Sequence, residues 1–584
     1  MNSRNTGKIY GINGPVIYLK GRHDFKMSEM VYVGNEKLVG EVISLDKNLT
    51  TIQVYEETSG LKPGEIVEGT GSAVSVTLAP GILDNIFDGI ERPLEQIAEK
   101  GGAFITRGVS VDSLDTVRQW DTHITVEEGD LVHGGMVIAE VPETRAIMHR
   151  CMVPPDVEGR VVSVVPDGKY TIQDVLVKVE LVDGNIRELT MTQKWPIRVP
   201  RPVSKRFPAS VPLVTGQRIL DTMFPIAKGG TAAIPGGFGT GKTMTQHQIA
   251  KWSDADIIIY IGCGERGNEM TQVLEEFSEL VDPRTGNLLM DRTTLIANTS
   301  NMPVAAREAS VYTAMTICEY YRAMGLKVLL LADSTSRWAQ ALREMSNRME
   351  ELPGADAFPV DLSAIISNFY SRAGMVVLNN GQTGSVTFIG TVSPAGGNLK
   401  EPVTESTKKA ARCFYALEQN RADKKRYPAV NPIDSYSKYL EYPEIKEYLD
   451  QTVMPGWVEM VEKTKNIIRK GKEANDQINI LGDDGVPMSY HEIFWKSELV
   501  DFVILQQDAF DAIDALCPVE RQKYMLQLVL GICDKDFTFE DYEKCRSFFK
   551  EIINILRQMN YSEFKSEKFN NYQQQLTNLI DNGN

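Results

Sequence analysis

Residues 236–243 (GGFGTGKT) constrain the fold of this chain more than any other feature, because they match the phosphate-binding pattern G-x-x-x-x-G-K-T. Glycines let the backbone turn so that successive N–H groups face an anion, and the helix that follows presents its positive end to the same anion. In this pattern Lys242 reaches the β- and γ-phosphates of a nucleotide, and the hydroxyl of Thr243 binds magnesium. The other loop positions, which would surround the phosphates, are Gly236, Gly237, Phe238, Gly239, Thr240 and Gly241.

The residues on both sides of this loop fit the arrangement that the motif requires, a strand before it and a helix after it. Residues 231–234 (TAAI) are a short apolar run typical of a buried strand. Residues 244–252 (MTQHQIAKW) contain no Gly or Pro and can form a helix. The sequence therefore predicts a site for a nucleoside triphosphate.

A second element supplies a candidate catalytic carboxylate. Residues 256–266 (DIIIYIGCGER) indicate a buried strand that ends in a Gly-rich turn bearing Glu265 and Arg266. Because ligands bind at the carboxyl ends of strands in open α/β sheets, Glu265 is placed where it can polarise an attacking water. The alternative is an ordinary surface pair of Glu265 with Arg266, since adjacent charged residues are common in loops.

A third element supplies a candidate metal ligand. Residues 327–333 (KVLLLAD) predict an apolar strand that ends in Asp333. A carboxylate at this position in phosphate-loop enzymes holds the magnesium ion. Any buried strand can end in Asp, so this pattern indicates a metal ligand only because the phosphate loop and Glu265 occur in the same chain.

The chain as a whole predicts a multidomain α/β protein. Closely spaced strands and turn residues near the amino terminus indicate a small barrel, whereas apolar residues at helical spacing in residues 545–559 indicate a helical tail. We predict five segments: a β-barrel (1–75), a connecting segment (76–109), an inserted β-rich domain (110–190), a parallel α/β core (191–440) and a helical domain (441–584).

Composition excludes several classes of function. The net charge of −16 argues against a bulk nucleic-acid binder, and we expect the basic cluster at residues 424–426 (KKR) to be solvated or to contact a partner. No stretch approaches the ~18 uninterrupted apolar residues of a membrane span, and residues 1–8 lack a signal-peptide pattern. Seven scattered cysteines without C-x-x-C suit a reducing compartment and argue against disulfides or zinc. We therefore expect a cytoplasmic protein.

The order of these segments resembles the catalytic A subunit of V-type and archaeal A-type rotary ATPases, over nearly the whole chain. The most specific motifs of the resemblance lie at residues 235–243, 262–270, 298–308 and 332–339. The inserted domain separates this family from the related F-type β subunits, which lack it. The resemblance implies that the core is a RecA-like nucleotide-binding domain.

The resemblance also implies a role for each candidate residue. Lys242 and Arg266 would stabilise phosphate charge, and Glu265 would activate water. Thr243 and Asp333 would serve the magnesium ion.

Three further residues enter through the resemblance. Arg337 would lie near the phosphates or support the carboxylates. Tyr427 and Phe510 would sandwich the adenine ring, although ordinary core packing is the alternative for either aromatic alone.

The implied function is that of a catalytic subunit that hydrolyses or synthesises ATP with Mg²⁺ and couples this reaction to H⁺ or Na⁺ transport across a membrane. Its implied partners are non-catalytic B-type nucleotide-binding subunits, which alternate with it in a hexamer and supply an arginine finger. Central shaft and peripheral stalk subunits connect the hexamer to a membrane sector, so the chain would lie on the cytoplasmic face of a membrane. No nucleic acid is implied.

Two other classes of function remain open at this point. A secretion-type ATPase or an RNA-translocating ring ATPase would share the nucleotide elements, but such chains lack the insert at residues 110–190. A regulatory subunit that binds ATP without hydrolysing it is a non-enzyme alternative. The intact Lys242, Glu265 and Asp333 argue against it.

Overall fold

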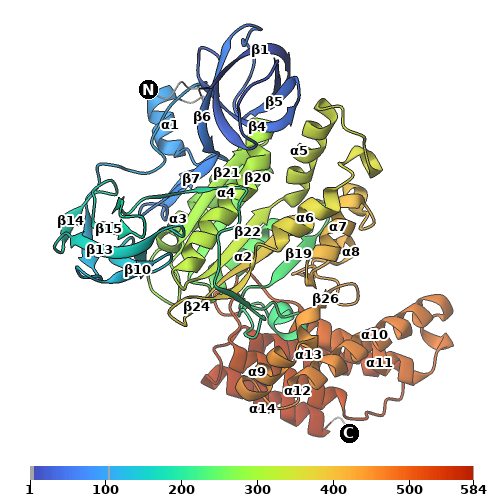
Figure 1. Cartoon of the computed structure of the whole chain (residues 1–584). Helices are drawn as coiled ribbons and strands as arrows, with labels where there is room; N and C mark the ends of the chain where they lie inside the picture. The colour runs from blue at the N-terminus through green and yellow to red at the C-terminus, as the bar shows by residue number, and fades with distance from the viewer. Residues whose placement is uncertain (1–4, 103–105, 583–584) are drawn as a thin grey trace. The chain divides into compact units, whose positions relative to one another are not determined.

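The computed structural model describes residues 5–102 and 106–582 (Figure 1). Residues 1–4, 103–105 and 583–584, which fall in the predicted barrel, connecting segment and helical domain, lie outside the described residues. The chain divides into two compact units. The first comprises the residues up to Phe207, Ala255–Val392 and Lys400–Ala410, and the second comprises Pro208–Asp254, Ser393–Leu399 and the residues from Ala411 onward.

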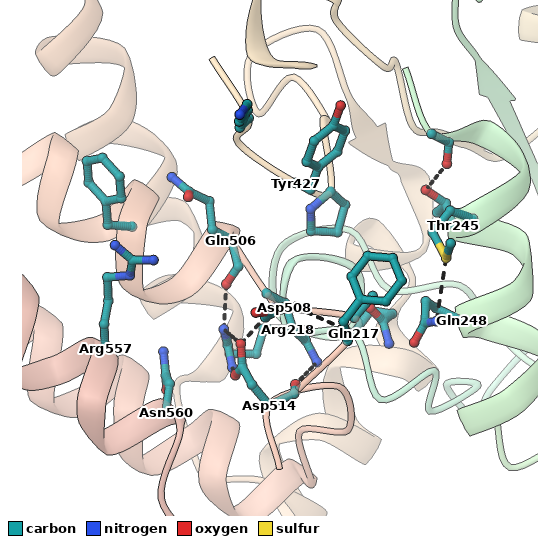
Figure 2. A pocket seen from close by; sticks show the side chains of 18 of the residues that line it. Gln217, Arg218, Thr245, Gln248, Tyr427, Gln506, Asp508, Asp514, Arg557 and Asn560 are labelled. Carbon is teal, nitrogen blue, oxygen red and sulfur yellow. Dashed lines mark hydrogen bonds and ion pairs between the residues drawn. The ribbon is translucent and has the colours of Figure 1, made fainter. Parts of the chain in front are cut away.

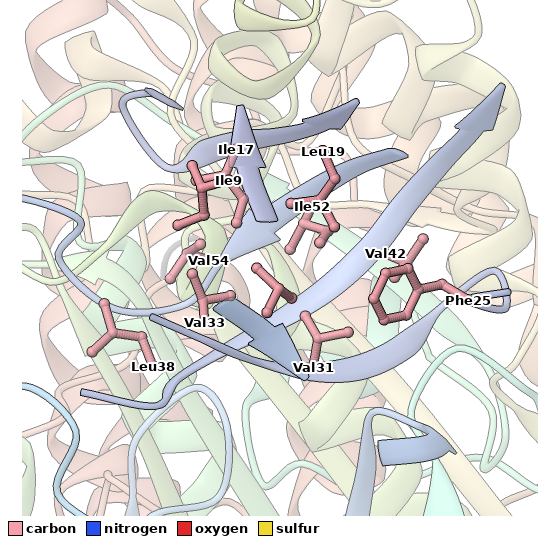
Figure 3. Close-up of a cluster of buried hydrophobic side chains, with 11 residues drawn as sticks. Ile9, Ile17, Leu19, Phe25, Val31, Val33, Leu38, Val42, Ile52 and Val54 are labelled. Carbon is pink, nitrogen blue, oxygen red and sulfur yellow. The ribbon is translucent and has the colours of Figure 1, made fainter. Parts of the chain in front are cut away.

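The first unit begins with a closed six-stranded antiparallel barrel, in the order β1-β2-β5-β4-β3-β6, as predicted. Alternating apolar residues point into the barrel, because successive side chains of a strand face opposite sides. Ile17, Val31, Ile52 and Val54 are among the fully buried residues of this core (Figure 3). The strands are β1 (Thr6–Asn13), β2 (Val16–Lys20), β3 (Glu29–Val33), β4 (Leu38–Asp46), β5 (Leu49–Val54) and β6 (Ile66–Ala73).

The insert consists of two four-stranded antiparallel sheets, in the orders β10-β13-β15-β16 and β12-β11-β9-β14. It is tied to the core by the fully buried His149, whose Nδ1 lies 2.7 Å from Glu143 and whose Nε2 lies 2.8 Å from the hydroxyl of Tyr320. The strands are β9 (Trp120–Ile124), β10 (Leu131–His133), β11 (Val137–Pro142), β12 (Met148–Met152), β13 (Glu158–Val164), β14 (Gly168–Tyr170), β15 (Val177–Leu181) and β16 (Ile186–Leu189).

The core of the first unit is a parallel sheet in the order β24-β22-β20-β21-β8. Its central strands are almost entirely buried and apolar, as expected for parallel strands that are covered on both faces. The strands are β8 (Asn85–Phe87), β20 (Ile257–Glu265), β21 (Thr293–Thr299), β22 (Lys327–Asp333) and β24 (Thr383–Val392). Both predicted strands that end in a candidate carboxylate are therefore confirmed.

Further strands and helices complete the first unit. β23 (Gly374–Val377) pairs antiparallel with both β24 and β18 (Lys205–Phe207). A separate two-stranded sheet is formed by β7 (Ser75–Leu78) and β17 (Gln193–Pro196). The helices are α1 (Leu94–Gly101), α3 (Gly267–Glu279), α4 (Val304–Ala323), α5 (Thr335–Arg348), α6 (Leu362–Tyr370) and α7 (Pro402–Ala410).

The second unit contains the phosphate loop and the helical part of the chain. β19 (Thr231–Pro235) precedes the loop and pairs parallel with β25 (Cys413–Phe414), which pairs antiparallel with β26 (Tyr436–Ser437). Periodic apolar residues such as Phe549, Ile552 and Leu556 are buried on one face of α13. The helices are α2 (Lys242–Trp252), α8 (Gln419–Asp423), α9 (Pro443–Thr452), α10 (Trp457–Leu481), α11 (Met488–Val500), α12 (Val519–Cys533), α13 (Tyr542–Asn560) and α14 (Glu567–Asn582).

The predicted fold class is thus confirmed: a barrel, a β-rich insert, a parallel α/β core and a carboxyl-terminal set of helices. The domain boundaries stay predictions. No helix in the described part of the chain is long and apolar enough to cross a membrane.

Candidate active site

The phosphate loop lies between β19 and α2, as predicted. Gly239 and Gly241 have φ angles of 78° and 87°, in the left-handed region that favours glycine. A Cβ atom on Gly236 would lie 2.5 Å from the hydroxyl of Thr240, so this position also requires glycine. The ammonium group of Lys242 donates to the carbonyl oxygens of Gly236 and Gly237, at 2.8 and 2.9 Å, and is thereby held against the loop.

A cavity of about 450 Å³ lies beside this loop within the second unit (Figure 2). Its volume is in the range of small-molecule sites. One side is formed by loop and α2 residues such as Gly241 and Thr245. Elsewhere it is lined by Tyr427, Pro428, Phe502, Gln506, Gln507, Asp508, Ala509, Phe510, Arg557, Asn560 and Tyr561, among others.

The structure therefore brings Tyr427 and Phe510 to the same cavity as the phosphate loop. Their side chains are 43% and 86% exposed, so ordinary core packing does not account for either aromatic. The ring of Tyr427 lies against Gly241, because a Cβ atom placed on that glycine would lie 3.7 Å from the ring. Exposed aromatic faces beside a phosphate loop are suited to hold a planar base.

Hydrogen bonds connect the two segments that carry these aromatics. The backbone N–H of Gln507 donates to the carbonyl oxygen of Tyr427 at 3.0 Å. Asp508 accepts from the backbone N–H of Phe510 at 2.9 Å, and its own N–H donates to Asp514 at 2.7 Å. The two aromatics are therefore positioned relative to each other by one continuous network.

Asp501, at the end of α11, joins this network to the helices. It accepts from Arg421 at 2.6 and 3.1 Å, from Arg426 at 3.2 Å and from the side chain of Gln506 at 2.9 Å. Burial alone would raise the pKa of Asp501, but Arg421 and Arg426 hold it below its ordinary value. Arg426 also donates to Glu498 at 2.8 and 3.0 Å. Of the two alternatives for residues 424–426, a solvated surface is therefore wrong for Arg426, and a contact with a partner stays a prediction.

A buried arginine, Arg218, supports the other side of the cavity. Its guanidinium donates to Asp514 at 2.5 Å and to the carbonyl oxygen of Gln506. Its backbone N–H donates to the side chain of Gln507 at 2.7 Å. Sequence reasoning missed Arg218, Asp501 and Asp514, because the pairs Arg218–Asp514 and Arg421–Asp501 join residues 296 and 80 positions apart in the chain and leave no spacing signal.

The first unit contains the two predicted carboxylates, on neighbouring parallel strands. Gly262 of β20 lies opposite Asp333 of β22, and Glu265 follows three residues later at the end of β20. Asp333 is buried and accepts from the hydroxyl of Thr391 at 2.7 Å. These contacts orient the Asp333 carboxylate at the carboxyl edge of the sheet, where ligands bind in such folds.

Glu265 has the environment expected of a functional group. Partial burial, the charge of Asp333 and the neighbouring Glu269 together raise its pKa from 4.5 to about 8, whereas Arg337 opposes the change. Strongly shifted pKa values cluster at catalytic sites. Among the described residues, Arg266 pairs with Glu269, at 4.0 Å, and not with Glu265, so the alternative of an adjacent surface pair is wrong.

Gly264 allows Arg337 to approach Glu265. Its φ angle is 71°, and a Cβ atom there would lie 2.9 Å from Cβ of Arg337. Arg337 lies in the first turn of α5, is exposed and donates to the side chain of Gln340 at 3.0 Å. Of the predicted residues, the first unit thus brings together Glu265, Asp333 and Arg337, with Arg266 at the surface, and the second unit brings together the phosphate loop, Tyr427 and Phe510.

Comparison with family models gives three matches along the chain. Residues 9–71 match the beta-barrel domain of the ATP synthase alpha/beta family. Residues 111–198 match the barrel-sandwich domain of the ATP synthase alpha/beta subunit, and residues 216–437 match the nucleotide-binding domain of the same family.

Individual relatives match over almost their whole length. The V-type ATP synthase alpha chain of Halothermothrix orenii is 50% identical, over 96% of this chain and 93% of the relative. The A subunit of the A-type ATP synthase of Methanopyrus kandleri is 48% identical, over 91% of this chain and 90% of the relative. The V-type ATP synthase alpha chain 2 of Clostridium tetani is 49% identical, over 97% and 94%.

Proposed function

Because this chain belongs to the ATP synthase alpha/beta family, among the V-type alpha and A-type A chains, we propose that it is the catalytic subunit of a rotary ATPase. It hydrolyses or synthesises ATP and couples this reaction to the transport of H⁺ or Na⁺. The observation that supports the proposal is the set of Lys242, Glu265 and Asp333: Lys242 is the first residue of α2, and Glu265 and Asp333 are the last residues of β20 and β22.

The phosphate loop and the cavity divide the binding of ATP between them. The backbone of residues 236–243 and the Lys242 ammonium group hold the β- and γ-phosphates. Tyr427 and Phe510 hold the adenine ring in the cavity that begins at Gly241. Stacking of a base on an aromatic side chain contributes about 1–3 kcal/mol, so the adenine ring adds substantially to the affinity for ATP that the phosphates provide.

Glu265 orients and polarises the water that attacks the γ-phosphate. Its raised pKa means that its negative charge is poorly compensated by its surroundings, so cations that accompany the nucleotide favour the charged form. Arg266 and Arg337 stabilise the charge that develops on the phosphate. A further arginine from a neighbouring subunit completes this set, since such a residue is worth roughly 10³–10⁵ in turnover in other NTPases.

The donor atoms available for a metal fit Mg²⁺. The hydroxyl of Thr243 and the carboxylate of Asp333 are oxygen ligands, which this ion prefers. Asp333 is already oriented by Thr391, so that its carboxylate is held in one position. When bound, Mg²⁺ would neutralise phosphate charge.

We further propose that the chain alternates with non-catalytic B-type subunits in a hexamer on the cytoplasmic face of a membrane, together with shaft and stalk subunits. The secretion-type and RNA-translocating alternatives lack the inserted domain, whereas residues 111–198 here match a domain of the ATP synthase family. No observation favours them.

The test is magnesium-dependent hydrolysis by the chain mixed with its B-type partner. Glu265→Gln should retain ATP affinity and lose at least about 100-fold in turnover, the lower end of the effect of a general base. Glu269→Gln, which removes the neighbouring carboxylate, is the matched control and should remain active. Near-normal hydrolysis by Glu265→Gln would remove the role assigned to Glu265, and strong activity of the chain without partner would contradict the shared site.

A further inference from the structure

A second cavity, separate from the nucleotide cavity, lies within the first unit where the insert meets the core. Its volume is about 220 Å³. Its lining includes Gly134 and Gly135 of the insert, Arg201 of the segment before β18, and Glu319 and Arg322 of α4. None of these residues belongs to the site described above.

The wall of this cavity contains more buried positive than negative charge. Arg201, Arg322 and the neighbouring Arg372 are only 2–5% exposed, and Glu319 is 1% exposed. Glu319 pairs with Arg372 at 2.5 Å. Among the described residues, Arg201 and Arg322 have no carboxylate within ion-pair distance. Three guanidinium groups and one carboxylate therefore leave two buried positive charges without a counter-ion.

The protein compensates Arg201 only in part. Nη2 of Arg201 donates to the side chain of Gln193 at 2.7 Å, and the guanidinium lies over the rings of Trp195 and Tyr320, at 5.5 and 5.3 Å. Its Nη1 is buried and has no hydrogen-bond partner among the described residues. Cation–π contacts recover only part of the free energy lost when an ion leaves water.

Arg322 is compensated in part as well. Its Nη1 donates to the backbone carbonyl oxygens of Arg372 and Gly374, at 2.9 and 3.4 Å. Burial, together with the positive charges of Arg206 and Arg372, lowers the pKa of Arg322 to about 10, although Glu319 opposes this. The positive charges on this side of the cavity therefore repel one another.

We propose that this cavity binds one small dianionic oxyanion, inorganic phosphate or sulfate, between Arg201 and Arg322. A double negative charge matches the two uncompensated guanidinium groups, and oxyanions accept the multiple N–H donors that arginine offers. Glu319 does not prevent binding, because its oxygens already accept from the backbone N–H of Arg201 and from Nε of Arg372, each at 2.5 Å. The anion would join the insert to α4 and stabilise that junction.

The experiment uses the full chain with Lys242→Ala, so that the phosphate loop does not contribute. Inorganic phosphate is titrated calorimetrically at an ionic strength held constant with chloride, and we expect one phosphate per chain. Arg206→Gln removes an exposed cation near Arg322 and should weaken binding about fivefold, whereas Arg322→Gln removes a direct donor and should weaken it at least about 50-fold. Arg160→Gln, an exposed arginine elsewhere in the insert, is the matched control and should change nothing.

The outcomes separate the possible ligands. Sulfate that competes with phosphate supports a general dianion site, and failure of sulfate to compete supports a site for phosphate itself. If Arg322→Gln does not fold, the phosphate affinity of Arg206→Gln tests the proposal instead. Absence of phosphate binding overturns the proposal, as does an affinity that Arg206→Gln leaves equal to that of Arg160→Gln, or equal binding of a monoanion such as formate.

Discussion

Replacement of Phe510 by alanine tests the base site most directly. Phe510 is 86% exposed, so its removal should leave stability nearly unchanged. A phenylalanine side chain that is covered on both sides buries about 150–250 Å². At this exposure, roughly 170 Å² of the ring is accessible, and a base stacked on one face would cover about half of that. At about 25 cal/mol per Å², the stacked ring contributes ~2 kcal/mol, which corresponds to about 30-fold in the Kd for ATP.

The assay compares two ligands of the full chain, Mg·ATP and Mg·tripolyphosphate, which carries the phosphates without the base. Phe510→Ala should raise the Kd for ATP about 30-fold and leave the Kd for tripolyphosphate unchanged. Phe238 provides the matched control, because it is equally exposed, at 87%, but does not line the cavity. Phe238→Ala should leave the ratio of the two Kd values unchanged. An equal loss for both ligands with Phe510→Ala, or a change in ATP affinity below about threefold, would refute the stacking role.

Three further predictions follow from the contacts around the site. Asp501→Asn should weaken ATP binding about tenfold without affecting the binding of tripolyphosphate, because Arg421 and Arg426 lose the negative charge that holds the Tyr427 segment. The control is Asp534→Asn, at an exposed pair with Lys463, which should change the Kd of neither ligand. Equal effects of the two variants would contradict the prediction. Since the pKa of Glu265 is raised from 4.5 to about 8, the folded chain keeps a proton that the unfolded chain releases between these pH values. Without nucleotide, the free energy of unfolding of the wild type should therefore fall by about 2 kcal/mol relative to that of Glu265→Gln as the pH rises from 5 to 9, after allowance for partial exposure. Melting curves whose difference does not grow with pH would show that the Glu265 carboxyl group is not desolvated. Gly264→Ala should lower the free energy of unfolding by at least about 1 kcal/mol and reduce turnover, because alanine is strained at this positive φ and its Cβ would displace Arg337. The control is Gly267→Ala, where an added Cβ meets nothing within 4 Å. Equal melting temperatures of the two variants would disprove the argument.

Local patterns predicted the elements that carry the nucleotide motifs. The apolar runs at residues 231–234, 257–261 and 328–332 lie in β19, β20 and β22, and the Gly-free run at residues 244–252 lies in α2, since such runs depend on neighbours in the chain. β20 continues beyond its apolar run through Gly262 and Gly264, where the sequence predicts a turn. Glu265 and Asp333 could be placed because each is the last residue of such a strand. The closely spaced strands and turn residues in the first 75 residues likewise predicted the barrel.

Contacts between distant segments could not be predicted in this way. Arg426 follows two lysines, and nothing in that triplet distinguishes a solvated arginine from one that pairs with Glu498 and Asp501, more than 70 residues away. The buried arginines around Glu319 also come from separate segments, so their excess of charge is evident only when the chain is folded. Such pairings depend on tertiary packing, which leaves no periodic signal in a single sequence.

The division of the chain between the two units has a consequence for its synthesis. The barrel is one continuous segment that ends at Ala73, and it can close as soon as this segment leaves the ribosome. The rest of the first unit is complete only at Ala410, about 340 residues later, or roughly 17–70 s at ordinary rates of translation. Once it has been made, β20 lacks its neighbour β22 until residues 327–333 follow, and β22 lacks its neighbour β24 until residues 383–392 follow. The phosphate loop awaits the segments of the second unit that carry Tyr427 and Phe510. The nascent chain therefore exposes apolar strands before their neighbours exist, which makes the period from the synthesis of β20 to that of β24 the one in which it most needs protection from aggregation.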